Sequence, residues 1–407
     1  MRKHWLLICF INFFIAASMG LVLRFVAIFP VPNINYQFLL HGHSHVAMLG
    51  WVYLMIYSLI VHFFIPKTAQ QKTIYNRLFW LTEIAVIGMM FRFPVEGYAF
   101  FSIIFSTLHI FCSYYFCRLV WKDAKTNSLP EKQLLRTALF FMLLSTLGVW
   151  CLGPAVGLLG KASAFYQIAI QFFLHFQFNG WFLFAILALF LKHLNATIDK
   201  KTFQRFYNFL VSATFLTLAL PVSWYLPNPL FHWINSLGVL LQLISFILFI
   251  QIIRPHFETF FSNLKTVEKL VYGFALTSLV LKVVIQLIVL IPELAQISHQ
   301  IRNFVIGYIH LTMLGIISGF LLGFVLQNTF LNGQKKRVKL GILLFLIGFT
   351  GTEILLFLQG SHFFFNKGQL AGYTENLFTA SIFLPLGLST LISSILLNFK
   401  AIQPQKL

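Results

Sequence analysis

Charged residues are scarce in this chain of 407 residues: they make up 10% of it, whereas 59% is hydrophobic. A soluble globular domain carries about 25% charged residues, so this chain cannot cover itself with a solvated surface. Acidic residues are the scarcest, with 10 Asp and Glu against 29 Lys and Arg. Because the basic residues lie in short segments between long apolar runs, their excess indicates a membrane protein and argues against a nucleic-acid-binding surface.

Cysteine is also rare, and each of the four cysteines lies within an apolar run. The sequence has no CxxC and no CxxCH motif, which excludes a covalently attached c-type haem and a zinc knuckle. The first apolar run continues through GLVLRFVAIF and is longer than the core of a signal peptide. We therefore interpret it as a retained helix.

Apolar runs long enough to cross a bilayer, about 20 residues each, occur twelve times. We place them near residues 4–28, 37–65, 77–94, 97–121, 134–158, 163–192, 205–226, 231–253, 267–292, 302–328, 337–359 and 376–399. The sequence thus predicts an all-α polytopic membrane protein with a single integral membrane domain over residues 1–407.

The distribution of basic residues predicts which side each loop occupies. With the N-terminus in the cytoplasm, the predicted outer loops hold only Arg92, Lys161, Arg302 and Lys367, and nearly all other Lys and Arg residues fall on the inner side. The positive-inside rule then places both termini in the cytoplasm. We expect a multi-pass protein of the bacterial inner membrane type, surrounded by lipid.

A short pattern recurs in the second, sixth and tenth runs. The segments read HVAMLGW from His45, HFQFNGW from His175 and HLTMLGI from His310. In each segment a glycine lies five residues after the histidine, and successive histidines are four runs apart. This spacing predicts three pseudo-repeats of four helices, over about 1–130, 131–260 and 261–407.

Histidines inside an apolar run need a reason, because an ionisable side chain in the bilayer is costly and marks a site by default. A neutral imidazole is a good ligand for iron, copper and zinc. We predict that His43, His45, His175 and His310 ligate haem or a metal, with His41 as a further candidate. A rotation of about 100° per residue puts His41 and His45 on one face and His43 on the other. We interpret His109, in the fourth run, as an interhelical hydrogen-bonding contact.

The segment GHSHVAMLGWVYLMIYSLIVHFFIP resembles the H-x-H-x3-LGW helix of haem-copper oxidase subunit I, especially its cbb-type and nitric oxide reductase members. It is also similar to the histidine-rich second helix of the NnrS family. The resemblance implies twelve helices in three blocks, with haem and copper ligands on the second, sixth and tenth helices. In the oxidases the H-x-H pair, here His43 and His45, ligates two haems.

Two features depart from that family. The oxidases carry the H-x-H pair on the tenth helix, whereas this chain has it on the second. Adjacent copper-binding histidines are missing from residues 205–226, and Asn179 stands where the oxidases have a tyrosine. These departures argue against the usual oxygen-reducing centre.

Other polar residues follow the same helices. Gln177 and Asn179 lie two and four residues after His175, where they could support it through hydrogen bonds.

Two carboxylates and three guanidinium groups complete the set of candidates. Glu83 and Glu353 could relay protons or balance the charge of a metal. Arg24, Arg92 and Arg302, on the predicted outer side, could pair with haem propionates.

The sequence therefore predicts a membrane haem protein, with copper allowed by the resemblance, that handles electrons or a diatomic gas such as nitric oxide or oxygen. As an enzyme it would be an oxidoreductase served by an electron-donor protein or a quinol. Two alternatives stay open: a histidine-based transporter of a metal ion or small solute, and a haem-binding sensing or assembly subunit without turnover.

Overall fold

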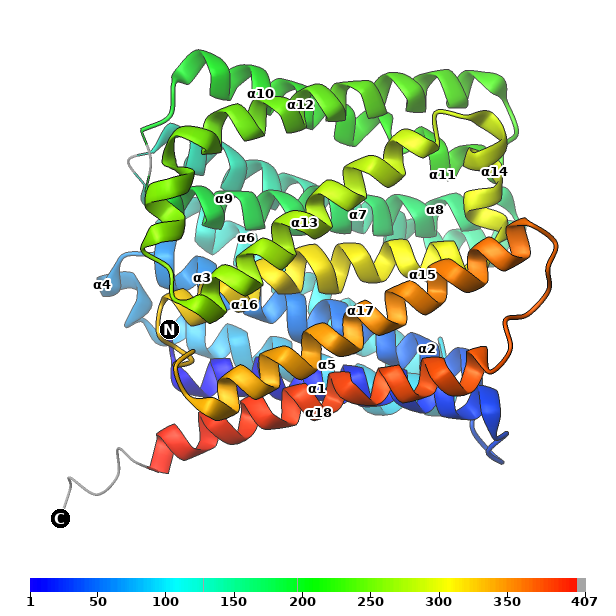
Figure 1. Ribbon diagram of the computed structural model, residues 1–407, viewed down its shortest axis with the longest axis horizontal. Coiled ribbons are helices and arrows are strands. Elements are labelled where there is room, and N and C mark those ends of the chain that lie inside the picture. Colours follow the sequence, from blue (N-terminus) through cyan, green and yellow to red (C-terminus); the bar gives the residue numbers. More distant parts are fainter. Residues whose placement is uncertain (127, 196, 401–407) are drawn as a thin grey trace. The chain divides into compact units, whose positions relative to one another are not determined.

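The computed structural model describes residues 1–126, 128–195 and 197–400. Within these ranges every regular element is helical (Figure 1). Twelve helices or helix series are long and apolar enough to cross a membrane, which confirms the predicted number of spans. The protein is a multi-pass membrane protein. Residues 401–407, including Lys406, lie outside the described residues.

Nine spans are α-helical, apart from one break in the seventh. They are α1 (Lys3–Ile28), α5 (Thr73–Glu96), α6 (Phe100–Asp123), α7 (Leu129–Leu159), α10 with α11 (Lys200–Leu216 and Ala219–Ser223), α12 (Pro229–Ser262), α13 (Thr266–Ile288), α17 (Lys336–Phe364) and α18 (Tyr373–Lys400). Two short helices, α4 (Lys67–Gln70) and α14 (Pro292–Gln300), lie between spans.

The other three spans each change from α-helix to π-helix and back. They are α2–η1–α3 (Tyr36–His45, Val46–Tyr53, Leu54–Phe64), α8–η2–α9 (Ala164–His175, Phe176–Phe182, Leu183–Leu194) and α15–η3–α16 (Arg302–His310, Leu311–Ser318, Gly319–Gln327). These are the second, sixth and tenth spans.

Capping residues explain where several spans begin and end. The Asn35 carboxamide oxygen accepts hydrogen bonds from the backbone N–H groups of Gln37 and Phe38 at the start of α2. Ser163 caps α8 in the same way, and such caps satisfy N–H groups that have no partner within the helix. Asn195 adopts a left-handed conformation with φ of 47° and ends α9.

The chain divides into two compact units. Unit 1 comprises residues 1–125, 265–272 and 318–407, and unit 2 comprises residues 126–264 and 273–317. Within unit 1, α18 packs along α17 and α1, and within unit 2, α10 packs along α12.

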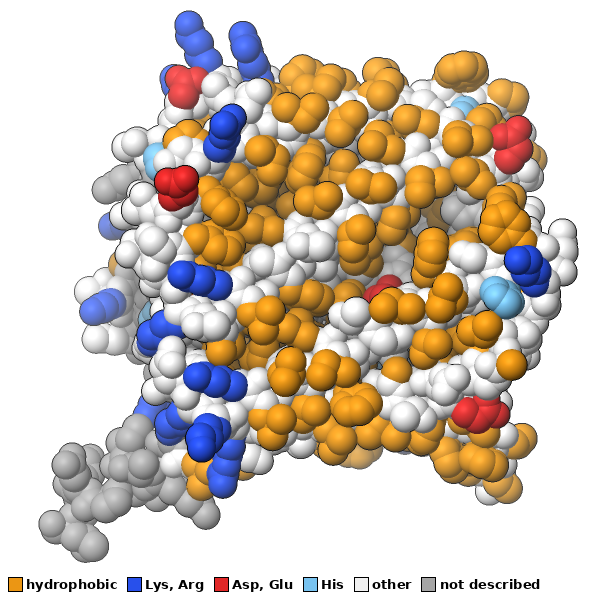
Figure 2. Space-filling view, in the orientation of Figure 1, with side chains coloured by type: hydrophobic (Ala, Val, Ile, Leu, Met, Phe, Trp, Pro, Cys, Tyr) orange, Lys and Arg blue, Asp and Glu red, His pale blue; other side chains and the backbone are white. Residues whose placement is uncertain are grey.

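Large apolar side chains cover the outer faces of the helices. Val95, Leu158 and Trp233 are among the most exposed, at 73%, 83% and 70%. Figure 2 shows hydrophobic side chains spread over the helices, with Lys and Arg side chains near helix ends. This surface suits contact with lipid.

Candidate functional site

A π-helical segment follows each of the three repeat histidines directly. His45, His175 and His310 are the last residues of α2, α8 and α15. These three spans are also the most buried: 83%, 78% and 83% of their most apolar stretches lie inside the protein, against 33–50% for the other nine. Because π-turns are rare and concentrate at functional sites, the three junctions are the strongest candidates in the chain.

The glycines of the pattern allow close contact between helices. A Cβ atom on Gly50 would lie 2.9 Å from Val86 Cγ1 and 3.1 Å from Asn12 Cβ. A Cβ atom on Gly180 would lie 2.6 Å from Phe141 Cβ. The absence of a side chain at Gly50 thus lets α1 and α5 pack closely against it, and its absence at Gly180 does the same for α7. In the H-x4-G pattern, the histidine is therefore followed, about one turn later, by a position of close helix packing.

In unit 1, backbone carbonyls fix the rings of two histidines. The Nδ1 atom of His43 lies 2.8 Å from the Ala16 carbonyl oxygen, and that of His45 lies 2.8 Å from the His41 carbonyl oxygen. A carbonyl oxygen can only accept, so Nδ1 carries the proton in both rings and Nε2 keeps its lone pair. Metal-ligating histidines are commonly oriented by this contact.

The two faces of α2 have different neighbours, as the helical rotation predicts. The His41 and His45 rings contact Tyr98, with centroid distances of 4.8 and 6.0 Å, and His45 stacks on Phe93 of α5 at 4.1 Å. His43 faces α1, where a Cβ atom on Gly20 would lie 3.0 Å from its ring.

The structure corrects the interpretation of His109. Among the described residues its ring makes a hydrogen bond only within its own helix, to Ser113, whose Oγ lies 3.4 Å from Nδ1. Ser113 donates its own proton to the His109 carbonyl oxygen, so Nδ1 is the donor in the ring contact. His109 Nε2 is buried and has no hydrogen-bond partner among the described residues.

His109 also lies within electrostatic range of His45 and packs edge-on against Tyr53 at 4.7 Å. Unit 1 therefore contains a second buried imidazole near His45 with a free Nε2. The sequence could not predict that His109 lies near His45, because a single histidine in an apolar run belongs to no recognisable motif.

In unit 2, protein groups occupy both nitrogens of His175. Nε2 donates to the Thr214 carbonyl oxygen at 2.7 Å, and the Asn179 amide nitrogen lies 3.5 Å from Nδ1. The predicted contact of Asn179 with His175 is thus present. Gln177 instead donates to Ser145 Oγ of α7 at 2.9 Å. His310 is partly buried at the end of α15.

The predicted carboxylates have neighbours of their own. Glu83 is 3% exposed and accepts a 2.8 Å hydrogen bond from Asn12, which also donates to the Gly50 carbonyl oxygen. This contact ties α1, η1 and α5 together. Glu353 of α17 lies within electrostatic range of Arg24.

The predicted propionate partners differ in what they contact. Arg92 forms a two-pronged ion pair with Glu96, at 2.8 and 3.2 Å, and lies over the Phe101 ring. To pair with a haem propionate, Arg92 would have to give up its ion pair with Glu96 or bind both carboxylates at once. Arg302 is the first residue of α15.

A polar cluster that the sequence reading missed surrounds Lys282 of α13. This side chain is 1% exposed, its Nζ donates to Gln286 Oε1 at 2.7 Å, and it lies over the Tyr308 ring. Beside it is a small cavity lined by polar and apolar residues of unit 2: Asn179, Leu183, Leu210, Ala213, Thr214, Thr217 and Gln242. From the sequence, Lys282 was only a lone charge in an apolar run.

Comparison with known proteins adds no relative: the chain matches no protein-family model and no curated protein. Function must therefore be argued from the residues themselves.

Proposed function

We propose that the protein binds haem within the membrane through the α2–η1 segment, with His45 as the residue that would chiefly hold the iron. The observation that carries this proposal is the hydrogen bond from His45 Nδ1 to the His41 carbonyl oxygen. It holds the ring in the tautomer that leaves Nε2 available to iron, at the junction with a π-segment in one of the most buried spans. His43 and His109 are the further ligand candidates in unit 1.

The ligand set favours haem over a bare ion. Haem iron needs only one or two protein ligands because the porphyrin supplies four, whereas zinc and similar ions take three or four side chains. Among the described residues no three His, Cys, Asp or Glu side chains lie together in a way that could hold a metal ion. Copper stays an expectation from the resemblance.

The protein's own groups would set the properties of such a site. The His41 carbonyl oxygen orients the ligand ring, and the Phe93 ring stacked on His45 shields it from water. A bound haem would supply one-electron transfer or the binding of a diatomic gas such as nitric oxide or oxygen. If the protein has turnover, it would be an oxidoreductase that receives electrons from a donor protein or a quinol. If it has none, it would be a sensing or assembly subunit.

The matching α-to-π junctions also support three pseudo-repeats of four helices, related to the plan of haem-copper oxidase subunit I and NnrS-like proteins. We include in the proposal the cytoplasmic placement of both termini and a bacterial-type inner membrane, both supported by the basic loops.

A reduced-minus-oxidised spectrum of protein purified in detergent from haem-supplied cells tests haem binding. We expect a Soret band and sharp bands in the reduced state, with about one haem or more per chain by pyridine haemochrome assay. Protein without haem absorbance under these conditions would rule the proposal out.

A small-solute transporter is the second candidate, favoured by the break in the seventh span. Helix α10 ends at Leu216 and α11 starts at Ala219, and the cavity beside Lys282 is lined by Thr214 and Thr217 at this break. Broken helices beside a cavity are typical of transporter sites. Because the Lys282 ammonium would repel a metal cation, an anionic solute fits this candidate better. Uptake into proteoliposomes by haem-free protein would favour it over the haem proposal.

A further inference from the structure

Lys282 carries a buried amine, and no carboxylate pairs with it among the described residues. No Asp or Glu oxygen lies within 4.0 Å of its Nζ among the described residues, and the ion pairs present in unit 2 involve other groups. The groups that face it are neutral: Gln286 on its own helix, Tyr308 on α15, and the cavity residues of α10, α12 and η2. His175 of α8 lies within electrostatic range as a second base. Isolated buried charge of this kind is costly unless it is paired.

Lys282 and Asn179, which line the cavity, have more N–H donors than the hydrogen bonds that they make within the protein. An ammonium group has three N–H donors, and Lys282 uses one of them on Gln286. The Asn179 amide has two, and one points to His175 Nδ1. Three donors from two residues lining one cavity are therefore available to a ligand.

The other polar residues in the cavity wall are already engaged. Thr214 and Thr217 donate their hydroxyl protons to backbone carbonyl oxygens of α10, and Gln242 donates its amide to Gln286. Asn179 Oδ1 is buried and has no hydrogen-bond partner among the described residues. The cavity volume of about 20 Å³ holds about one water-sized species.

We infer that this cavity is a binding site for a monatomic anion of the size of chloride, held by the Lys282 ammonium and the Asn179 amide. A water molecule would fill the same space but would not neutralise the charge. The inference does not depend on haem, because all of its residues belong to unit 2 and none is a proposed ligand in unit 1.

Thermal unfolding of the purified protein in detergent tests the site, with chloride titrated against gluconate at constant ionic strength. Gluconate is too large for the cavity. We expect the unfolding midpoint of the wild type to rise by several degrees with chloride and to saturate, because a ligand that binds only the folded state stabilises it. Lys282→Met should abolish this response and, without chloride, should unfold no earlier than the wild type. Asn179→Ala should weaken the response.

Lys161, exposed in the turn before α8, provides the matched control, and Lys161→Met should keep the full response. A wild type whose unfolding midpoint is indifferent to chloride would overturn the inference. A Lys282→Met protein that retains the chloride response would overturn it as well, because the anion would then bind elsewhere. Neither readout uses haem absorbance, so the outcome is independent of the haem proposal.

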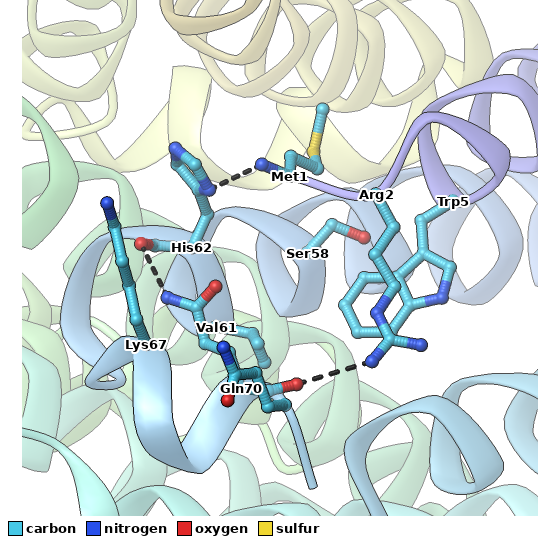
Figure 3. A pocket seen from close by; sticks show the side chains of 9 residues that line it. Met1, Arg2, Trp5, Ser58, Val61, His62, Lys67 and Gln70 are labelled. Atoms are coloured by element: carbon cyan, nitrogen blue, oxygen red, sulfur yellow. Dashed lines mark hydrogen bonds between the residues drawn. The ribbon is translucent and has the colours of Figure 1, made fainter. Parts of the chain in front are cut away.

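A different observation carries a second inference, in unit 1. A larger cavity of about 350 Å³ lies where the start of α1 meets the end of α3 and helix α4, and it is lined by Arg2, Trp5, Ser58, His62, Lys67, Gln70 and others (Figure 3). Arg2 and Lys67 are exposed cations, and the lining contains no carboxylate.

Hydrogen bonds and one cation–π contact hold the wall of this cavity in place. The Arg2 guanidinium lies over the Trp5 ring and donates to the Gln70 carbonyl oxygen at 3.3 Å, and the Gln70 amide donates to the carbonyl oxygens of His62 and Ile65. The cavity lies at the ends of membrane spans, at the level where lipid headgroups are expected. We propose that this cavity binds a phosphate group, carried by an anionic lipid or free in solution.

Native mass spectrometry of protein released from nanodiscs tests this second site. We expect phosphatidylglycerol to be retained several-fold more than phosphatidylcholine, and Arg2→Gln with Lys67→Gln to remove the preference, whereas Lys72→Gln, exposed outside the cavity, should not. If inorganic phosphate displaces the lipid, the site recognises free phosphate too. Equal retention of both lipids, with no phosphate binding, would contradict the proposal.

Discussion

His45→Ala is expected to remove most of the haem from the purified protein and to lower Soret absorbance per chain by about tenfold or more. The substitution deletes the Nε2 lone pair of a ring that the His41 carbonyl oxygen already orients. Loss of outer hydrogen-bonding partners alone commonly costs 10- to 100-fold in metal affinity, so loss of the ligand should cost at least as much.

The accompanying variants separate ligation from general damage. His109→Ala and His43→Ala should each change the position or intensity of the bands, because both rings offer an Nε2 atom in unit 1. His256→Ala, near the end of α12, is the control and should leave the spectrum unchanged. If His45→Ala retained full absorbance and band positions, our ligand assignment would be wrong.

Gly50→Ala is expected to destabilise the protein by about 1–3 kcal/mol, the usual cost of overpacking a tight contact. The added methyl group would lie 2.9 Å from Val86 Cγ1 and 3.1 Å from Asn12 Cβ, and Asn12 in turn holds Glu83. Val86→Ala removes the nearest atom, so the double variant should recover part of the loss in a double-mutant cycle.

Gly157→Ala is the matched control for this substitution. Gly157 lies in α7, and a Cβ atom there would meet nothing within 4 Å, so the change should be neutral or slightly stabilising through helix propensity. Unfolding midpoints in denaturant compare the wild type, Gly50→Ala, Val86→Ala, their double variant and the control. Equal stability of Gly50→Ala and Gly157→Ala would show that the glycine after His45 has no packing role.

The fold was largely predictable because transmembrane spans are set by length and hydrophobicity. The observed ends of two spans differ from the predicted ones. The eighth span continues through Arg254 and Pro255 to Ser262, beyond its predicted end near 253. The seventh breaks after Leu216, before the short helix α11 that contains Pro221.

The site was less predictable. Repeat spacing identified the three junction histidines, but π-helical hydrogen bonding has no sequence signature of its own. Nothing near His109 in the sequence indicated its proximity to His45, which arises when α6 and α2 fold into one unit. The polar surroundings of Lys282 come mostly from other helices, including Tyr308 of α15 and Asn179 of η2, and these residues are not close to Lys282 in the sequence.

The most direct test of the central claim is a cryo-electron microscopy map of the purified protein after growth with added haem. We predict planar porphyrin density in unit 1, with iron bonded to Nε2 of His45 and with the His45 Nδ1 contact to the His41 carbonyl oxygen intact. A map with His45 against lipid or protein alone, or with iron held by residues outside α2, η1 and α6, would contradict our account.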